Sequence, residues 1–209
     1  MLRFQGRSND GRFRSALNVV ALMAALISLV AFSGAAFSLD TKLAQGKRGK
    51  MTNDPVVVME TTKGTIKIQV FKNEAPITAG NFLDLVGKGF YNGLTFHRYE
   101  PNFVIQGGDP KGTGMGGYID PQTGRERTIP LEKKPNLRHD SAGIVAMARS
   151  DNPNSASSQF YITLAPATFL DNPPGYAVFG KVIDGLNAAL ALRQGDKMTK
   201  VSMLEPANK

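Results

Sequence analysis

The 209-residue chain contains no cysteine and only two histidines, His97 and His139. Without cysteine it can form no disulfide framework, no thiolate nucleophile and no cysteine-based zinc site. Two histidines alone also argue against a transition-metal site, so we expect neither a metal nor another cofactor. The sequence has no GxSxG nucleophile elbow either, which leaves conventional hydrolase chemistry few candidates.

The surplus of positive charge is concentrated near the N-terminus. The whole chain has 25 Lys and Arg against 17 Asp and Glu, a formal net charge of +8. Residues 1–50 hold eight of these basic residues and two acidic ones, or +6, which leaves 17 against 15, or +2, for residues 51–209. A nucleic-acid-binding domain should carry its basic surplus on the folded part. We therefore expect no nucleic-acid partner.

A long apolar run, Ala16 to Leu39, follows four arginines, and residues 19–32 within it carry no charge. A basic stretch before an apolar one is typical of a signal peptide or signal anchor. The run reaches the roughly 20 residues that a helix needs to cross a bilayer. We expect a hydrophobic helix in residues 1–39, either cleaved near the small residues 33–36 or kept as an anchor. A buried core helix is disfavoured because the run is apolar on all faces.

The rest of the chain divides into a linker and a body. Residues 40–54 are polar, charged and aperiodic, which predicts a flexible basic linker. Residues 55–209 then form the folded domain. With the signal or anchor in front of it, this domain is expected outside the cytoplasm, in a periplasm or lumen, either secreted or held at the membrane.

The body is predicted to be dominated by β-strands. Short runs of alternating or apolar residues, separated by Gly, Pro and Asn, predict strands at 56–61, 64–70, 94–99, 103–106, 144–148, 160–164, 177–182 and 201–204. Helices are expected at 75–88, with Pro76 in the first turn, and at 185–192. Many short strands with few helices are typical of an antiparallel barrel or sandwich.

Three isolated features point to ordinary structural roles. Residues 112–117 match GxGxxG, but residues 118–124 cannot start a helix, so we expect a flexible loop and no dinucleotide site. His97 lies inside a predicted strand, and we expect it to be a hydrogen-bonded structural histidine. His139 falls in a polar loop.

The clearest signal is a set of ordered motifs. Residues 96–109 read Phe-His-Arg-Tyr-Glu-Pro-Asn-Phe-Val-Ile-Gln-Gly-Gly-Asp. Ile-Val-Ala-Met-Ala follows at 144–148, Ser-Ser-Gln-Phe-Tyr-Ile at 157–162, Phe-Leu-Asp at 169–171 and Val-Phe-Gly-Lys-Val at 178–182. Together these segments resemble the cyclophilin signature, in the order of that family.

The resemblance covers Val56 to about Leu204. It implies a closed eight-stranded antiparallel barrel capped by two helices, behind the N-terminal hydrophobic helix. It also implies a peptidyl-prolyl cis-trans isomerase (EC 5.2.1.8 class), a rotamase that assists protein folding as a chaperone does. Its substrates would be proline-containing polypeptides, and the protein is expected to be a monomer.

Arg98 is the catalytic residue that the resemblance implies. The barrier to rotation is ~18–20 kcal/mol because the amide is conjugated. In the twisted state the prolyl nitrogen loses conjugation and accepts a hydrogen bond better, so a fixed donor stabilises that state selectively. A guanidinium stays charged and presents several N–H groups in one plane. The alternative for Arg98 is a surface ion pair at a strand end.

Ten further residues are implied to bind substrate. The proline pocket would be formed by Phe103, Val104, Tyr161 and Leu170, which would otherwise be interpreted as ordinary core. Gln106 and Gln159 would hydrogen-bond Arg98 or the substrate backbone, and Ala148 and Arg149 would pair with the substrate main chain. Phe169 and Tyr176 complete the set.

Five of these positions differ from the commonest eukaryotic pattern. This sequence has Val104 where Met is usual, Tyr161 where Phe is usual, Arg149 where Asn is usual, Phe169 where Trp is usual and Tyr176 where His is usual. The pattern looks like a bacterial cyclophilin. Without the indole of the usual Trp, cyclosporin is expected to bind weakly at most. Two alternatives stay open: a non-catalytic module that binds proline peptides, and a membrane-anchored scaffold.

Overall fold

The computed structural model describes residues 54–204. The expected N-terminal helix, its cleavage region and all of the linker except Asp54 lie outside these residues. Within residues 54–204, no helix has the length and apolar character needed to cross a membrane.

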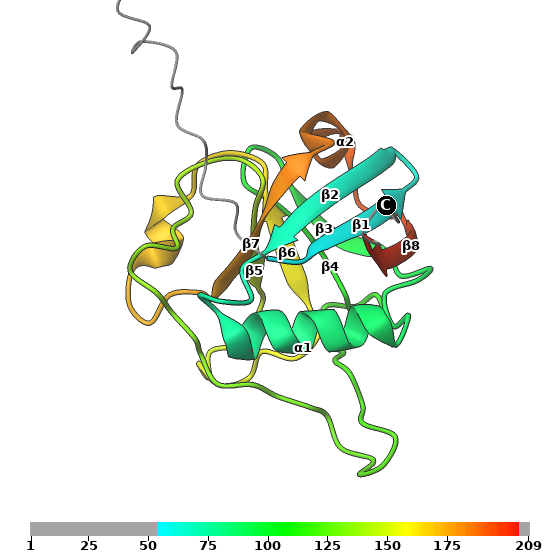
Figure 1. The fold of residues 1–209 in the computed structure, drawn as a ribbon, viewed down its shortest axis with the longest axis vertical. Coiled ribbons are helices and arrows are strands. Elements are labelled where there is room, and N and C mark those ends of the chain that lie inside the picture. The colour runs from blue at the N-terminus through cyan, green and yellow to red at the C-terminus, as the bar shows by residue number, and fades with distance from the viewer. Residues whose placement is uncertain (1–53, 205–209) are drawn as a thin grey trace, which may run out of the picture. The chain divides into compact units, whose positions relative to one another are not determined.

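Eight antiparallel strands form one sheet, in the order β3-β4-β6-β5-β7-β2-β1-β8. The sheet curls on itself (Figure 1). The strands are β1 Val56–Thr61, β2 Gly64–Val70, β3 Phe96–Glu100, β4 Val104–Gly107, β5 Ile144–Met147, β6 Phe160–Thr163, β7 Val178–Asp184 and β8 Met198–Met203. All eight agree with the predicted strands, and β8 differs most because it starts three residues before the predicted 201.

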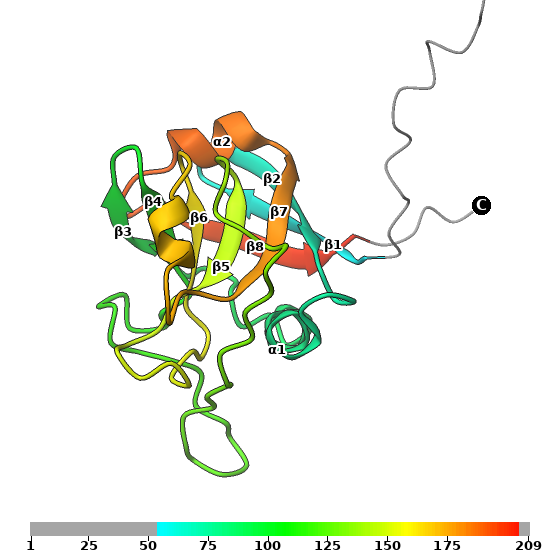
Figure 2. The same cartoon turned by 90° about the vertical axis from the view of Figure 1, so that its left-hand side faces the viewer.

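Two helices lie at opposite ends of the curled sheet, as Figure 2 shows. They are α1 (Pro76–Gly87) and α2 (Leu186–Ala191). Pro76 occupies the first turn of α1, as predicted, where its missing N–H costs no hydrogen bond. A short 3₁₀ helix, η2 (Thr168–Asp171), is an element that the sequence does not predict.

The sheet buries side chains on both of its faces. Along β4 and β6, Ile105 and Phe160 join the large inner core, while Val104 and Tyr161 belong to a second, smaller cluster. Successive residues of a strand point to opposite faces, so this second cluster lies on the outside of the curl. It carries most of the residues that the sequence assigns to the site.

The predicted closed barrel needs a correction at one seam. Strands β3 and β8 are the two edges of the sheet, and a single bridge between Thr95 and Lys197 joins them. Backbone bonds flank it, from Phe96 N to Asp196 O (2.8 Å) and from Met198 N to Leu94 O (2.9 Å). The bridge precedes the first residue of both strands, and antiparallel strands run in opposite directions. From the bridge the two edge strands therefore run away from each other, and the seam stays short.

Candidate active site

Two adjacent cavities open on the outer face of the sheet. The first, here called the Arg98 pocket, measures about 300 Å³ and is lined by Arg98, Phe103, Val104, Gln106, Ala148, Arg149, Tyr161, Leu170 and Tyr176. The second, here called the Met115 pocket, measures about 370 Å³ and is lined by Gln106, Gly114, Met115, Gly116, Glu126, Thr128, Ala148, Arg149, Ser150, Ser155, Ser157 and Gln159. The structure thus brings nine of the predicted site residues to the first cavity and Gln159 to the second.

Strand register explains why residues far apart in sequence meet in the Arg98 pocket. Gln106 of β4 pairs with Arg98 of β3 on one side and with Tyr161 of β6 on the other. Tyr161 pairs in turn with Ala146 of β5. Directly paired residues share a face of the sheet. The polar and the aromatic groups therefore stand side by side on the outer face.

The Arg98 side chain is held by two polar contacts. Its Nη1 donates to Oε1 of Gln106 at 3.3 Å, and its Nη2 lies 3.5 Å from Oε1 of Glu100. The Glu100 pair is exposed, with 43% and 49% of the two side chains accessible, so it contributes little stability. A guanidinium has five N–H donors. These contacts leave donors of Arg98 available to a ligand.

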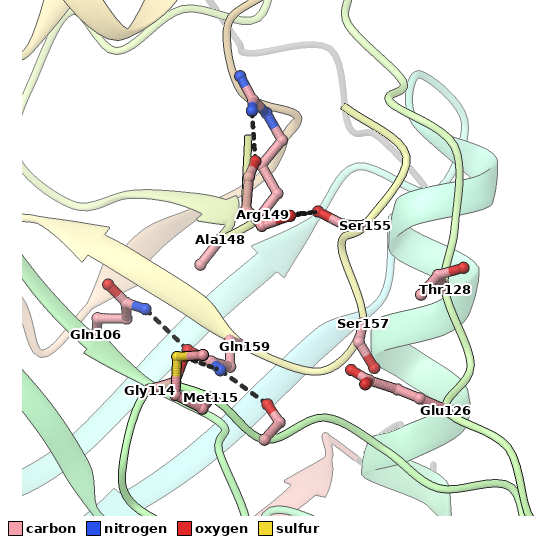
Figure 3. A pocket seen from close by; sticks show the side chains of 12 residues that line it. Gln106, Gly114, Met115, Glu126, Thr128, Ala148, Arg149, Ser155, Ser157 and Gln159 are labelled. Atoms are coloured by element: carbon pink, nitrogen blue, oxygen red, sulfur yellow. Dashed lines mark hydrogen bonds between the residues drawn. The ribbon is translucent and has the colours of Figure 1, made fainter. Parts of the chain in front are cut away.

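A chain of side-chain amides continues from Gln106 (Figure 3). Its Nε2 donates to Oε1 of Gln159 at 2.9 Å, and Nε2 of Gln159 donates to the carbonyl oxygens of Gly114 (2.9 Å) and Gly116 (2.7 Å). Gln159 therefore hydrogen-bonds Gln106 and the loop, and among residues 54–204 no hydrogen bond joins it to Arg98. The orientation of Arg98 depends through two glutamines on the loop at 112–117.

That loop is the segment that matches GxGxxG, and it folds around a carboxylate. Asp109 is buried, and its side chain accepts N–H bonds from Lys111 (2.7 Å), Thr113 (2.8 Å) and Gly114 (2.6 Å). Burial alone would raise the pKa of Asp109, but the backbone N–H groups around it outweigh that effect and lower its pKa. The glycines serve this turn, since a Cβ at Gly116 would overlap the Asp109 carboxylate.

Aromatic and aliphatic side chains form the rest of the Arg98 pocket. Phe103, Val104, Leu170 and Tyr176 line it together with Tyr161. The predicted residue Phe169 does not line it. Its side chain is 60% exposed and packs at the rim against Phe103, with ring centroids 5.3 Å apart.

Arg149 lies between the two cavities and lines both. Its guanidinium carbon lies 4.6 Å from the centroid of the Tyr176 ring. Its Nε and Nη2 donate to the carbonyl oxygen of Gly175 at 3.1 and 2.9 Å, and Nη1 donates to that of Ser150 at 2.7 Å. These bonds hold the guanidinium against Tyr176 as a fixed wall between the pockets.

The two histidines differ from the sequence-based expectations. The sequence places His139 in a polar loop, yet it is fully buried behind Tyr161. His97 is expected to be hydrogen-bonded; its two ring nitrogens are buried without a hydrogen bond of good geometry within the described part of the chain. Burial lowers the pKa of His97, although the neighbouring Gln159 acts to raise it. Sequence reasoning also missed the far side of the Met115 pocket, where Figure 3 shows Glu126, Thr128 and Ser157.

No cluster of three or more metal-ligating His, Cys, Asp or Glu side chains occurs within residues 54–204. The site that these residues do form is a fixed guanidinium beside an apolar pocket, on the outer face of a curled eight-stranded sheet. This fold and this site together define a cyclophilin-like isomerase.

The comparison with known families agrees. The sequence profile of the family described as "Cyclophilin type peptidyl-prolyl cis-trans isomerase/CLD" matches residues 56–207. The chain belongs to this family and is a peptidyl-prolyl cis-trans isomerase.

Individual relatives resemble most of the described chain. A peptidyl-prolyl cis-trans isomerase-like 1 of Rhizopus delemar is 43% identical over 137 residues, 66% of this chain and 79% of the relative. The peptidyl-prolyl cis-trans isomerase ppi1 of Schizosaccharomyces pombe is 44% identical over 134 residues, 63% of this chain and 80% of the relative. These relatives are eukaryotic, so they lend no support to the bacterial pattern expected from the site residues.

Solved structures show the same fold. A crystal structure of a cyclophilin type peptidyl-prolyl cis-trans isomerase of Cryptosporidium parvum matches with a TM-score of 0.64 and 32% identity, and covers 73% of this chain and 99% of its own. A second structure of that protein, determined in the presence of the dipeptide Ala-Pro, matches with a TM-score of 0.63 and 32% identity, and covers 72% of this chain and 99% of its own.

Proposed function

We propose that the Arg98 pocket binds the proline ring of an X-Pro segment and that Arg98 stabilises the twisted amide. The observation that carries this assignment is that Arg98, which has N–H donors not used by Gln106 or Glu100, lies beside an apolar cavity of about 300 Å³. Phe103, Val104, Leu170 and Tyr161 would enclose the ring. Phe169 would contact the substrate only at the rim.

Rotation about the X-Pro bond requires the protein only to position the substrate and a hydrogen-bond donor. No bond to a side chain forms, and the donor gains strength only as the prolyl nitrogen loses conjugation. Each tenfold in rate requires about 1.4 kcal/mol. A charged donor that is already oriented by Gln106 supplies part of this without further ordering when the substrate twists.

Residues between the two pockets would align the substrate chain. Ala148 and Arg149 line both cavities, so a peptide with its proline in the Arg98 pocket would pass them on its way to the Met115 pocket. Gln159 would hydrogen-bond both the substrate backbone and Gln106. We infer substrates that are proline-containing polypeptides, a monomeric enzyme, no nucleic-acid partner and weak cyclosporin binding at most.

The experiment that tests the role of Arg98 compares two arginine substitutions in the full-length chain. Arg98→Ala should lower kcat/KM for a short Ala-Pro peptide by about a hundredfold or more, the usual cost of removing a donor aimed at a transition state. Arg125→Ala, in an exposed loop, is the matched control and should leave the rate near that of the wild type. The wild-type rate should also persist in EDTA.

Three results would contradict this assignment. Equal losses in the two variants would remove Arg98 from the mechanism. A loss of activity in Arg98→Ala that tracks an equal loss of thermal stability would mean a structural role. A wild-type chain that binds the peptide without accelerating exchange would favour the non-catalytic binding module.

We further propose that the enzyme assists the folding of exported proteins from outside the cytoplasm. The support is the basic stretch followed by the apolar run from Ala16 to Leu39, which is typical of a signal peptide or signal anchor. A flexible tether spans roughly 5–6 Å × √n. The linker of residues 40–54 would let the domain reach chains that emerge at the membrane. We also propose that the site residues follow the pattern of a bacterial cyclophilin.

A further inference from the structure

A buried histidine lies behind the wall of the Arg98 pocket, and the proposed isomerase mechanism does not use it. His139 is fully inaccessible to solvent. Its Nδ1 lies 2.7 Å from Oδ1 of Asp171, and its Nε2 lies 2.8 Å from the hydroxyl of Tyr161. The His139 and Tyr161 rings stack at an interplanar angle of 21°. The three side chains form a continuous hydrogen-bonded row.

The row joins two separate walls of the pocket. Tyr161 belongs to β6, and Asp171 is the last residue of η2, whose Leu170 lines the pocket from the other side. Backbone bonds strengthen the link, since Ala167 N donates to His139 O at 2.8 Å and His139 N donates to the Asp171 carboxylate at 3.3 Å. Sheet and 3₁₀ helix are therefore tied together at His139.

Hydrogen bonding assigns the protons in this row. Burial lowers the pKa of His139 and outweighs the neighbouring Asp171 carboxylate, which acts to raise it. A neutral imidazole has one donor and one acceptor nitrogen. Because Nδ1 faces a carboxylate, it carries the proton, and Nε2 accepts the hydroxyl hydrogen of Tyr161. Burial also raises the pKa of Tyr161, which keeps that hydrogen in place.

We propose that His139 and Asp171 are positioning residues, which hold the Tyr161 ring and Leu170 in the shape that accepts a proline ring. This inference rests on the proposed function of the Arg98 pocket. The hydroxyl hydrogen of Tyr161 is directed at His139, so the tyrosine presents an apolar ring to the pocket. Without that hydroxyl, Nε2 of His139 would be a buried acceptor with no donor, which is a costly arrangement.

The row should respond to acid. Besides Tyr161, the ionisable groups that face His139 are Asp171, Lys133 and Asp140, while Arg138 contacts the Asp171 carboxylate. Tyr161 faces Tyr176 and Arg149 on its other side. Because the pKa of His139 lies below its ordinary value of 6.5, the ring is neutral at pH 7 and gains a proton only on acidification. Nε2 then becomes a donor, and the Tyr161 hydroxyl must turn its own hydrogen elsewhere.

The test uses two matched substitutions in the full-length chain. Tyr161→Phe keeps the ring and removes the hydroxyl. His139→Asn keeps an amide that can donate to Asp171 but is too short to reach Tyr161. Each should raise KM for a short Ala-Pro peptide by about threefold to tenfold, the factor typical of one net hydrogen bond. The effect on kcat should be smaller, because pocket shape affects the ground and transition states alike.

The double variant and the pH profile complete the test. Tyr161→Phe combined with His139→Asn should raise KM no further than either change alone, because both break the same bond. The KM of the wild type should rise on acidification from pH 7, because the lowered pKa of His139 keeps its ring neutral at pH 7, whereas the KM of Tyr161→Phe should change less. If His139→Asn fails to fold, as judged by circular dichroism, Tyr161→Phe and its pH profile decide the question alone.

A wild-type KM and pH profile in Tyr161→Phe would overturn the inference. So would additive effects in the double variant. Either result, combined with the expected loss in Arg98→Ala, would leave the proposed function intact and remove only the row of positioning residues. Failure of the proposed function itself would appear instead as Arg98→Ala activity equal to that of the wild type.

Discussion

At the residue scale, the placement of Arg98 depends on side-chain amides. Gln106 accepts from Arg98, and Gln159 accepts from Gln106 while donating to the carbonyls of Gly114 and Gly116. Each amide uses its oxygen as an acceptor and its nitrogen as a donor. Every hydrogen bond in this chain of amides, from the loop carbonyls to the guanidinium, therefore has a defined donor and a defined acceptor. The donor is therefore oriented before substrate arrives, which is what electrostatic stabilisation of a transition state requires.

The exposed ring of Phe169 yields a prediction about cyclosporin. Phe169→Trp should tighten cyclosporin binding by about tenfold or more, because an indole adds contact area at the rim and one N–H donor. Isothermal titration of the two proteins would measure the difference. Phe169→Leu serves as the control and should bind no better than the wild type. Tight binding by the unmodified protein would contradict the proposed role of this position.

At the scale of secondary structure elements, a glycine in helix α1 and a glycine before helix α2 differ in whether a side chain could replace their hydrogen. Gly80 lies inside α1, and a Cβ there would meet no atom within 4 Å. Gly185 precedes α2 with φ of +77°, and a Cβ there would overlap the carbonyl oxygen of Thr65. The first glycine is replaceable and the second is required by the close approach of α2 to β2.

This contrast predicts opposite changes in stability. Gly80→Ala should raise the free energy of unfolding by about 0.5–1 kcal/mol, because alanine favours the helix. Gly185→Ala should lower it by about 2–4 kcal/mol, through strain and overlap with the backbone. Urea denaturation of both variants would measure the difference. A change of the same sign in the two would show that the environment of these glycines is misassigned.

The loop around Asp109 predicts an acid sensitivity. Burial alone would raise the pKa of this carboxyl, but the backbone N–H groups of Lys111, Gly116, Gly114 and Thr113 hold it below the ordinary value of 3.8. A carboxyl with a lowered folded-state pKa stabilises the fold above its unfolded-state pKa. That stabilisation is lost as the pH falls through the folded-state value.

Melting temperatures measured from pH 6 to pH 2 would test this. Asp109→Asn should be less stable than the wild type at pH 6, because a neutral amide accepts the N–H groups less strongly. The gap between the two proteins should narrow as the pH falls below about 4. A constant gap across the range would mean that the ionised form of Asp109 contributes nothing.

At the scale of the whole molecule, the N-terminal segment predicts where the enzyme is found. The apolar run after four arginines should take the domain out of the cytoplasm. Fractionation of cells that make the full-length chain should recover it with the membrane or outside the cytoplasm. Mass spectrometry of the N-terminus then separates the two forms: a start near Ala36 or Phe37 means cleavage, and a retained Arg3–Arg14 region means anchoring. Intact protein in the soluble cytoplasm would contradict both.

Much of the fold was predictable because its signals are local. Alternating residues such as Ile66, Ile68 and Val70 form the inner face of β2, as a half-buried strand requires. The eight-stranded antiparallel sheet and its two helices were predicted, whereas the extent of closure was not, because it depends on how far β3 and β8 run alongside each other. The offset between β3 and β8 depends on the whole chain that connects them. It therefore cannot be inferred from the residues of either strand.

The sequence by itself determined the strands, the two helices and the motif that marks Arg98 as the residue to consider. The tertiary structure alone decided which side chains meet behind Tyr161, in the wall of the Arg98 pocket. His139 lies 22 positions before Tyr161 and 32 before Asp171, and their hydrogen bonds form only when β6 and η2 pack against the segment that carries His139. A polar loop in the sequence thus becomes a buried row of side chains, because burial depends on what packs over a residue and not on its neighbours in the chain.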